Sequence, residues 1–566
     1  MRHSKSVAWV AAVAVAGAAV VLGEEPVEVA TTPGQQTRGA RMGAPEMKLS
    51  MRDAVGLALE HNINLEVSRL GLAGSTAALD GSRGLFDPYL NLQGSASESS
   101  NPATNQLVGA AVATSRRRSL DLSLGKLFAT GTELTVGWTN SRTATNSSFY
   151  FLNPSYSSGF TLGLKQPLLR GFGTDVNRAG IEVARRNRDL SRLAFEQIVI
   201  ATLQQVESAY WNLVYRIDNL AVKRQSLKLA QDLLDQTRTR VRIGTAAPID
   251  IVQSEATVAA REQEIIVAEN QVEDAADLLK QLMGFENTED WRSRIVPTDR
   301  LEQQPEPVSL EAALDEALRR RVELQQKQLE TEVREVALLS ARNATLPAFG
   351  INVNYGYAGV GGTETVRDGA GNVIAVNKGG WDDALRRITD LDYKQWSAGF
   401  QFTYTLGNHD ARARLAQRRY ELRSARESLA LQRQAVIADV RAAVRGLEAG
   451  AKSIAAATKA RELAERNLDA EQKKFANGMS TNYQVLKIQE DLAAAQASEL
   501  YAKVAYRIAK VQYEAAIGRL PETMGVRIAD EAPAAPTLAL ESAGWLKYRS
   551  WTRDPDLAPA AAGEGK

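Results

Sequence analysis

Side chains suited to catalysis or metal binding are scarce in this chain of 566 residues. It contains no cysteine and three histidines, His3, His61 and His409, which lie far apart in the sequence. Zinc sites need cysteines or histidines at short spacings, and thiol catalysis needs a cysteine, so the sequence predicts neither. We therefore expect no catalytic residue, no cofactor and no metal ion, and we do not expect an enzyme.

Three short segments carry residue types that bind phosphates or ions in other proteins. The glycine-rich residues 359–362 resemble a phosphate-binding loop only superficially, because no helix start follows them, and a plain loop is expected. Residues 368–372, with two glycines between Asp368 and Asn372, are expected to form a turn rather than an ion site. The basic run at residues 116–118 lies at a predicted strand edge; it could contact lipopolysaccharide, but a solvated loop is the favoured interpretation.

The sequence contains an internal duplication, which predicts where the helices and strands lie. Three glycines recur with one constant offset: Gly173, Gly244 and Gly284 correspond to Gly407, Gly478 and Gly518. Residues 49–59 likewise align with residues 308–318, but with a larger offset. The difference between the two offsets means that the first copy carries about 25 extra residues, in a β-rich stretch. We expect two helix–strand–strand–helix repeats, at residues 48–300 and 301–525.

The N-terminus predicts export. A basic start precedes an apolar run over residues 7–22, and Gly23 follows at a site suited to a signal peptidase. We expect residues 1–23 to be a signal peptide; the alternative is an uncleaved membrane anchor, for which the run is short. Residues 24–47 are expected to form a flexible linker, and the alanine- and proline-rich residues 526–566 a loosely ordered tail.

Two regions, residues 88–168 and 348–406, alternate apolar and small polar side chains with a period of two. The clearest runs are about 9–11 residues long, which is the length a tilted strand needs to cross a bilayer. Long polar loops are expected at residues 98–117, 140–157 and 359–392. A half-buried soluble β-sandwich, whose strands also alternate, is the alternative. The residues expected to face lipid are Trp138, Phe160, Leu162, Phe349, Ile351, Tyr355, Trp396, Phe400, Phe402 and Tyr404.

The helical segments are unusually long. No glycine or proline occurs from Ile181 to Ile243, and a helix over this stretch would be roughly 95 Å long. Two helical hairpins are predicted, at residues 174–284 and 409–518. The second helix of each hairpin, the returning helix, carries a seam of residues at heptad spacing. In the second hairpin this seam begins at Val485, Ile488 and Leu492. Seams of mostly small and medium apolar residues indicate that the hairpins close into a ring with other copies.

In this order, these features resemble the outer membrane efflux protein family, the TolC-like exit ducts of Gram-negative bacteria. The resemblance covers residues 49–525. It rests on two entry helices (49–70 and 308–330), a strand-to-helix joint at residues 166–173, and a tip motif that occurs around Gly244 and again around Gly478.

The resemblance implies an α+β membrane protein that forms a homotrimer. Each protomer would give four strands to a twelve-stranded transmembrane β-barrel, which a long periplasmic α-helical barrel would continue. The extra strands near residues 118–140 depart from this count. Either they extend the extracellular rim, or the strand assigned near residues 90–97 is wrong.

The resemblance also assigns roles at the hairpin tips. The residues that would dock a periplasmic adaptor are Arg242, Gly244, Thr245, Asn477, Gly478 and Met479. The candidate pore constriction consists of Asp250, Gln484, Lys487, Glu490 and Asp491. Some relatives narrow the tip with acidic residues, but Gln484 and Lys487 hold the matching positions here, which argues against an anionic ring. The ordinary interpretation of each charge is a helix-end partner or a solvated face.

The sequence therefore predicts a passive exit duct in the outer membrane of a Gram-negative bacterium, with a large periplasmic portion. It would complete a tripartite efflux or type I secretion system. Its partners would be a periplasmic adaptor (membrane fusion protein), an inner-membrane transporter of the RND or ABC type, and outer-membrane lipid, with no role for nucleic acid. The alternative is a secreted or periplasmic coiled-coil structural protein with a soluble β-domain.

Overall fold

The computed structural model describes residues 46–103, 109, 111–147, 149–300, 307–369 and 372–527. These residues belong to one compact unit that begins at Glu46. The predicted signal peptide (1–23), residues 24–45 of the predicted linker and residues 528–566 of the predicted tail lie outside the described residues. The linker prediction extends two residues too far, because Glu46 and Met47 pair with Arg294 and Ile295 in a small parallel sheet.

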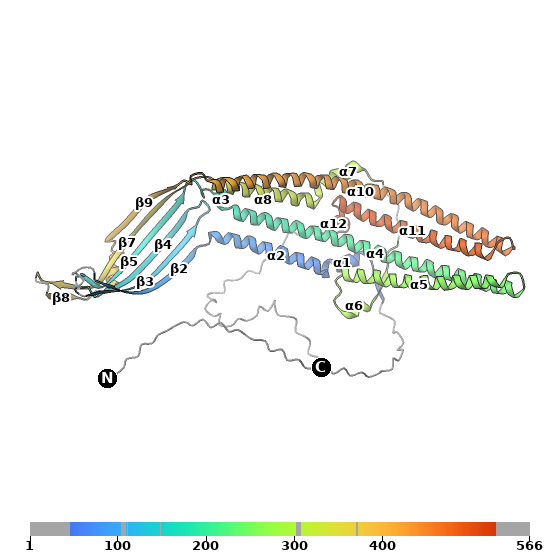
Figure 1. Cartoon of the computed structure of the whole chain (residues 1–566), viewed down its shortest axis with the longest axis horizontal. Coiled ribbons are helices and arrows are strands. Elements are labelled where there is room, and N and C mark those ends of the chain that lie inside the picture. The colour runs from blue at the N-terminus through green and yellow to red at the C-terminus, as the bar shows by residue number, and fades with distance from the viewer. Residues whose placement is uncertain are drawn as a thin grey trace, which may run out of the picture. The chain divides into compact units, whose positions relative to one another are not determined.

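The other strands form a single antiparallel sheet at one end of this unit (Figure 1). Its strands are β2 (Tyr89–Pro102), β3 (Val112–Leu127), β4 (Glu133–Thr145), β5 (Leu152–Pro167), β7 (Ala348–Arg367), β8 (Val373–Asn377) and β9 (Tyr393–Thr403). Across the sheet the order is β2-β3-β4-β5-β7-β9, and the short β8 pairs with the last residues of β7. No described strand pairs with the outer edge of β2 or of β9.

The strand register separates an apolar face from a polar face, because directly paired residues point to the same side of a sheet. One apolar row consists of Leu92, Leu122, Trp138, Phe160 and Tyr357. The adjacent row on the opposite face consists of Asn91, Ser123, Gly137, Thr161 and Gly356. All the residues expected to face lipid share the apolar face, except Tyr404, which follows the last residue of β9.

The sheet is wider than the resemblance implies. Among the described residues six long strands, β2 to β5, β7 and β9, lie side by side, where four per protomer were expected. The strand near residues 90–97 exists, since β2 pairs with β3 along its whole length. The extra residues of the first repeat therefore form a complete hairpin, β3–β4, that widens the sheet instead of extending one loop.

The strands are also longer than predicted, up to 20 residues in β7. Their ends run into all three stretches that were expected to be loops, 98–117, 140–157 and 359–392. Serine, asparagine and glycine favour turns. They do not end a strand whose partner continues to satisfy its backbone hydrogen bonds, as β3 does for the last residues of β2.

The expected loop at residues 359–362 is likewise wrong, because these residues lie within β7 and a helix packs across them. This helix, α9 (Trp381–Thr389), was not predicted. A Cβ at Gly359 would lie 1.9 Å from the carbonyl oxygen of Ala384, and one at Gly361 would lie 2.3 Å from that of Gly380. The glycines are thus needed for close approach of the helix backbone to the sheet.

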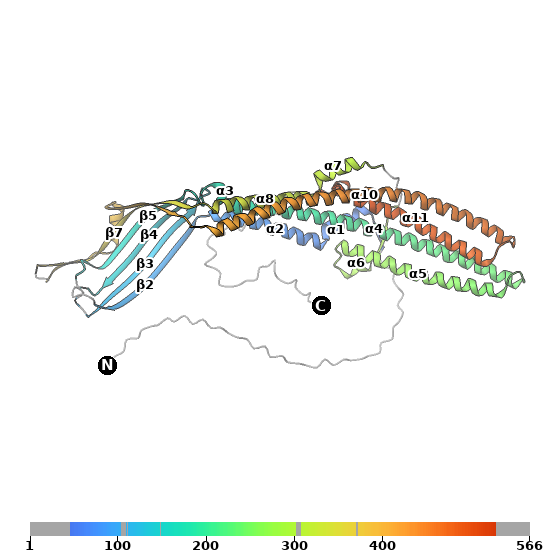
Figure 2. The same cartoon turned by 45° about the horizontal axis from the view of Figure 1, so that its top comes forward.

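The long helices form a layer that extends from one end of the sheet (Figures 1 and 2). They are α2 (Ile63–Arg83), α4 (Ala179–Arg242), α5 (Pro248–Leu282), α8 (Val322–Ala344), α10 (His409–Ala476) and α11 (Asn482–Ala516). Near the sheet the packing order is α2-α4-α8-α10, and toward the hairpin tips it is α5-α4-α11-α10. One edge of the layer is therefore α2 followed by α5, and the other edge is α10 throughout.

Short elements join these helices. They are β1 (Glu46–Leu49), α1 (Met51–His61), the 3-10 turn η1 (Gly84–Phe86), α3 (Thr174–Asn177), α6 (Thr288–Arg292), β6 (Arg294–Pro297), α7 (Leu310–Arg320) and α12 (Leu520–Thr523). Within the part of the chain that the structure describes, no helix combines the length and apolarity that a membrane span requires.

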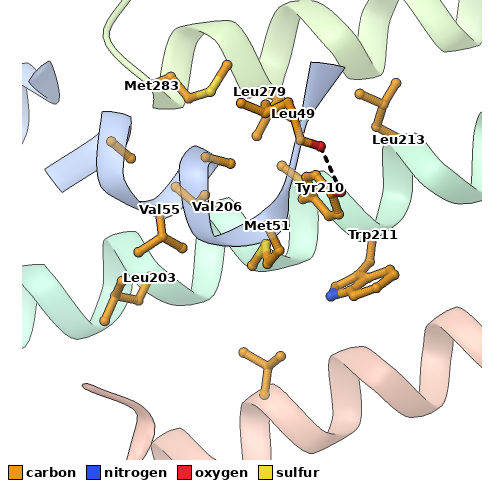
Figure 3. Packing of buried hydrophobic residues seen from close by; sticks show 14 of the residues in the cluster. Leu49, Met51, Val55, Leu203, Val206, Tyr210, Trp211, Leu213, Leu279 and Met283 are labelled. Atoms are coloured by element: carbon orange, nitrogen blue, oxygen red, sulfur yellow. Dashed lines mark hydrogen bonds between the residues drawn. The ribbon is translucent and has the colours of Figure 1, made fainter. Parts of the chain in front are cut away.

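The largest core lies where the first entry helix meets the long helices (Figure 3). Leu203, Val206 and Leu213 of α4 pack against Val55 of α1 and against Leu279 at the end of α5. In the middle of this cluster the buried hydroxyl group of Tyr210 donates to the Leu49 carbonyl oxygen at 3.1 Å.

A second core repeats the arrangement in the second half of the chain. It joins α7 to α10, with Ala313, Ala317 and Val440 at its centre. These residues correspond by the two offsets to Ala54, Ala58 and Val206, which are buried in the first core. The duplication seen in the sequence is therefore also a duplication of packing.

Candidate functional site

The two hairpin tips turn through the same backbone geometry. Gly244 and Gly478 have φ angles of +80° and +76°, in the left-handed region that favours glycine. In each turn the next amide donates to the carbonyl five residues earlier: Thr245 to Arg240 and Met479 to Lys474, both at 2.9 Å. This pattern is a Schellman motif, which ends a helix by satisfying its last carbonyl groups.

The returning helices begin with different caps. In α5 the carboxylate of Asp250 accepts a hydrogen bond from the amide of Ala247 at 3.3 Å, and Pro248 occupies the first turn. In α11 the hydroxyl group of Thr481 accepts from the amide of Gln484 at 3.3 Å. Asp250 therefore serves as a helix-end partner, the ordinary role considered for it.

All six residues expected to dock an adaptor are exposed. They lie among large apolar side chains that are more than half exposed: Ile243, Ile249 and Val252 on the first tip, and Met479 and Tyr483 on the second. Except for Met479, these apolar residues were absent from the predicted site, although they belong to the tip motif. Exposed apolar groups gathered at one place are typical of a protein-interaction surface.

A buried polar cluster joins three helices just behind the tips. Asn482 of α11 donates through its amide nitrogen to the hydroxyl group of Ser254, at 2.8 Å, and to the carbonyl oxygen of Asp250, at 3.2 Å. The hydroxyl group of Thr237 in α4 lies 3.2 Å from the Asn482 amide oxygen. Because these groups are buried, losing one partner would leave others unsatisfied in a low-dielectric environment.

A second contact fixes the end of α4 to the end of α10. The guanidinium group of Arg240 donates to the Phe475 carbonyl oxygen at 2.8 Å and lies 3.9 Å from the centre of the Phe475 ring. Phe475 in turn packs with Leu233, Val485 and Leu486. Sequence reasoning identified the seam residue Val485 but not Arg240, whose partner lies 235 residues further along the chain.

The candidate constriction residues do not form one group. Gln484, Lys487, Glu490 and Asp491 share the exposed side of α11, while Asp250 lies at the start of α5. The Lys487 ammonium group lies 3.5 Å from a carboxylate oxygen of Glu490 and 3.5 Å from one of Asp491. The charges of Glu490, and then of Asp491, raise the pKa of Lys487, so this helix presents a partly neutralised cluster rather than an acidic one.

Nearer the sheet, an ion pair with a buried carboxylate links α4 to α11. Arg507 lies 2.9 Å from the carboxylate of Glu207, which is 1% exposed and also accepts a hydrogen bond from the indole of Trp211 at 3.3 Å. Burial raises the pKa of Glu207, although the charge of Arg507 opposes the shift. The two hairpins are thus held together at their tips and again in the middle of the helical layer.

The described residues include no cluster of three or more histidine, aspartate or glutamate side chains that could hold a metal ion.

Comparison with known proteins gives a consistent match. The model of a family described as outer membrane efflux protein matches residues 54–285 and 313–519, which together make up most of the chain. Outer membrane protein TolC of Escherichia coli (strain K12) is 26% identical over 328 residues, covering 56% of this chain and 61% of that protein. TolC of Vibrio cholerae is 23% identical over 321 residues, covering 56% and 68%. The matched part thus spans less than two thirds of the Escherichia coli relative.

A solved structure extends the likeness over most of the fold. The Campylobacter jejuni CmeC outer membrane channel superimposes with a TM-score of 0.60 at 14% identity, covering 85% of this chain and 87% of that chain.

Proposed function

The chain belongs to the outer membrane efflux protein family, a family of outer-membrane channels rather than enzymes, and we propose that it is the passive exit duct of a tripartite export system. It is an outer-membrane protein with a large periplasmic portion. In the proposal, three copies close into a β-barrel within the membrane and a helical barrel in the periplasm. The duct conducts cargo that an inner-membrane transporter, of the RND or ABC type, delivers through a periplasmic adaptor.

The main support for the proposal is that the two unpaired edges of the sheet line up with the two edges of the helical layer. β2 follows α2 in sequence, and β9 leads into α10, so each edge of the sheet continues as the matching edge of the helical layer. An open strand edge is a liability, and ring closure removes it. The six described long strands alternate in direction, so β9 of one copy and β2 of the next would run antiparallel, as a closed barrel requires.

The side chains at the two helical edges support the same closure. Along one edge, α2 exposes Ile63, Val67 and Leu70, and α5 exposes Ile266 and Val267. Along the other edge, α10 exposes Tyr420, Leu431 and Leu463. Apolar groups of this size are costly to leave in water, and a neighbouring copy would cover them.

The proposed barrel has eighteen strands, because each of three copies supplies the six described long strands. This replaces the twelve strands implied by the resemblance. In such a ring the apolar face contacts lipid, and the face with Ser123, Thr161 and Asn354 lines the pore. Barrels of 16–18 strands enclose an aqueous channel, so the outlet would be wider than that of a twelve-stranded barrel.

The hairpin tips are the proposed docking surface for the adaptor. The two Schellman turns present Ile243, Ile249 and Met479 to the periplasm at the end of the duct. The contacts of Arg240 and Asn482 behind the tips hold the two hairpins of one copy together. Opening would then be a shear of packed helices, in which hairpins of neighbouring copies slide while each pair stays joined.

Cryo-electron microscopy of the detergent-extracted protein tests the closure. We expect a threefold particle with eighteen strands and with β9 of one copy beside β2 of the next. A monomer, or a ring in which these edges stay unpaired, would refute the proposal. A twofold particle would keep the edge pairing and refute the trimer.

A further inference from the structure

A pair of arginines lies on the apolar face, at the border of its apolar side chains that is farther from the helices. Arg118 of β3 and Arg142 of β4 are directly opposite each other in the register. The same row continues to Tyr156 of β5, and Leu120 is the next residue after Arg118 on this face of β3. In the proposed barrel this face is turned toward lipid, so the pair would lie where the apolar band gives way to the outer surface.

This arrangement is unfavourable in the protein alone, because like charges directly opposite each other destabilise an antiparallel sheet. Among the described residues no carboxylate forms an ion pair with either guanidinium group, whereas the neighbouring Arg116 lies 2.9 Å from Glu98. Arg142 donates to the Tyr156 hydroxyl group at 3.2 Å, and its guanidinium lies 5.7 Å from that ring. Tyr156 thus orients one arginine without neutralising it.

The groups around the pair are those of a membrane interface. Leu120 and Leu122 continue the apolar stripe on β3, and successive residues on one face are about 7 Å apart. On β4, Trp138 stacks on Trp381 of α9 with ring centres 5.9 Å apart. α9 also carries the exposed Arg386 and Arg387. Tryptophan and arginine at the border of an apolar band are typical of residues that meet lipid headgroups.

We propose that Arg118 and Arg142 together bind a phosphate group of an outer-leaflet glycolipid whose acyl chains lie along the apolar stripe. A single anion between the two guanidinium groups would remove their repulsion, and arginine is suited to phosphate because it offers paired donors in a fixed plane. The inference rests on the proposed barrel, which decides that this face meets lipid. It corrects the expectation that residues 116–118 form a solvated loop, since all three lie within β3.

The chain supplies its own matched control. Arg117 lies between Arg116 and Arg118 in sequence and is exposed, but its side chain belongs to the polar face. Arg118→Gln and Arg142→Gln, singly and together, can therefore be compared with Arg117→Gln, which removes the same charge from the opposite side. The probe is lipid A, a phosphorylated acylated disaccharide, titrated into the detergent-extracted assembly and compared with its dephosphorylated form.

We expect the double variant to bind lipid A at least about tenfold more weakly, and Arg117→Gln to stay within about twofold of the natural protein. The natural protein should also prefer the phosphorylated form by at least about tenfold. Equal affinity for the two forms, or unchanged affinity of the double variant, would overturn the inference and leave the duct proposal intact. A loss confined to Arg117→Gln would mean that the faces are reversed, which would overturn both.

Assembly must be checked separately, because a variant that fails to form the particle would bind nothing. Size-exclusion chromatography and imaging report the assembled fraction of each variant. If the double glutamine variant does not assemble, Arg118→Lys with Arg142→Lys keeps both charges but not the paired donors. The inference then requires weaker lipid A binding by this lysine variant, and unchanged binding would overturn it.

Discussion

The two repeats differ little in their helices and greatly in their strands. Both tips have the same left-handed glycine and the same Schellman bonds, and both entry helices bury equivalent alanines against the long helix. The first repeat, however, supplies β2 to β5, while the second supplies β7 and β9 with a helix between them. A helical barrel fixes how many helices each copy can contribute, whereas an antiparallel sheet can grow by whole hairpins without changing the direction of its edges.

The strongest test of this comparison is to remove strands from the first repeat. Replacing residues 103–151 by a short turn deletes β3 and β4 and brings β2 beside β5, which run antiparallel. We expect a functional particle, with a pore area reduced to roughly 0.4–0.5 of its natural value because barrel diameter grows about linearly with strand number. Single-channel conductance measures the change.

The control deletes β4 alone. This would make β3 and β5 neighbours, although they run in the same direction and parallel strands need a crossover of about a dozen residues or more. No particle should form. If the single-strand deletion assembled as well as the hairpin deletion, strand direction would not determine which deletions the first repeat tolerates.

The ion pair of Glu207 with Arg507 distinguishes the two helical halves. The constant offset places Arg441, an exposed residue, at the position equivalent to Glu207. Glu207→Ala would leave the partly buried Arg507 without this carboxylate partner, at a cost of about 1–3 kcal/mol in the free energy of unfolding. Arg441→Ala should cost no more than about 0.5 kcal/mol.

Thermal denaturation of the extracted assembly, followed by circular dichroism, ranks the two variants. The helices should melt well below the natural Tm in Glu207→Ala and close to it in Arg441→Ala. Equal shifts would show that the contact between α4 and α11 does not depend on this pair.

A charge on the apolar face should be costly in both repeats. Leu162 and Trp396 are equivalent by the offset and lie in one row of the register with Tyr355. An arginine at either position should cost about 2–4 kcal/mol if the row lies near the middle of the bilayer. The adjacent Thr161 and Gln395 belong to the polar face, and arginine there should be tolerated.

The yield of assembled protein in outer-membrane fractions reports this difference. Loss of assembly for Leu162→Arg and Trp396→Arg, with normal yield for Thr161→Arg and Gln395→Arg, fits the assigned faces. The reverse pattern would mean that the polar face, and not the apolar face, contacts lipid.

Sequence patterns predicted those parts of the fold that local chemistry determines. Period-two alternation identified the apolar face, and glycines bounding long helical stretches located both tips, because only glycine readily takes the left-handed turn. The ends of the strands and the helix α9 were missed, since glycine and serine there act through neighbours distant in sequence. The contacts of Asn482 were missed for the same reason: its spacing to Thr481 suggested a cap, and nothing local pointed to Ser254 or Thr237.

The tip glycines give the smallest effect and the closest comparison of the repeats. A Cβ at Gly244 or Gly478 would meet no atom within 4 Å, so alanine at either position would cost only the left-handed backbone, about 1–2 kcal/mol. At Gly284 the φ angle is +73° and a Cβ would also lie 2.1 Å from the carbonyl oxygen of His61, so Gly284→Ala should cost more than either tip variant. Thermal denaturation orders the three variants. Gly244→Ala and Gly478→Ala should shift the Tm equally. A clear difference between them would show that the two tips contribute unequally to the stability of the assembled duct, so that the two helical halves would not be equivalent at their turns.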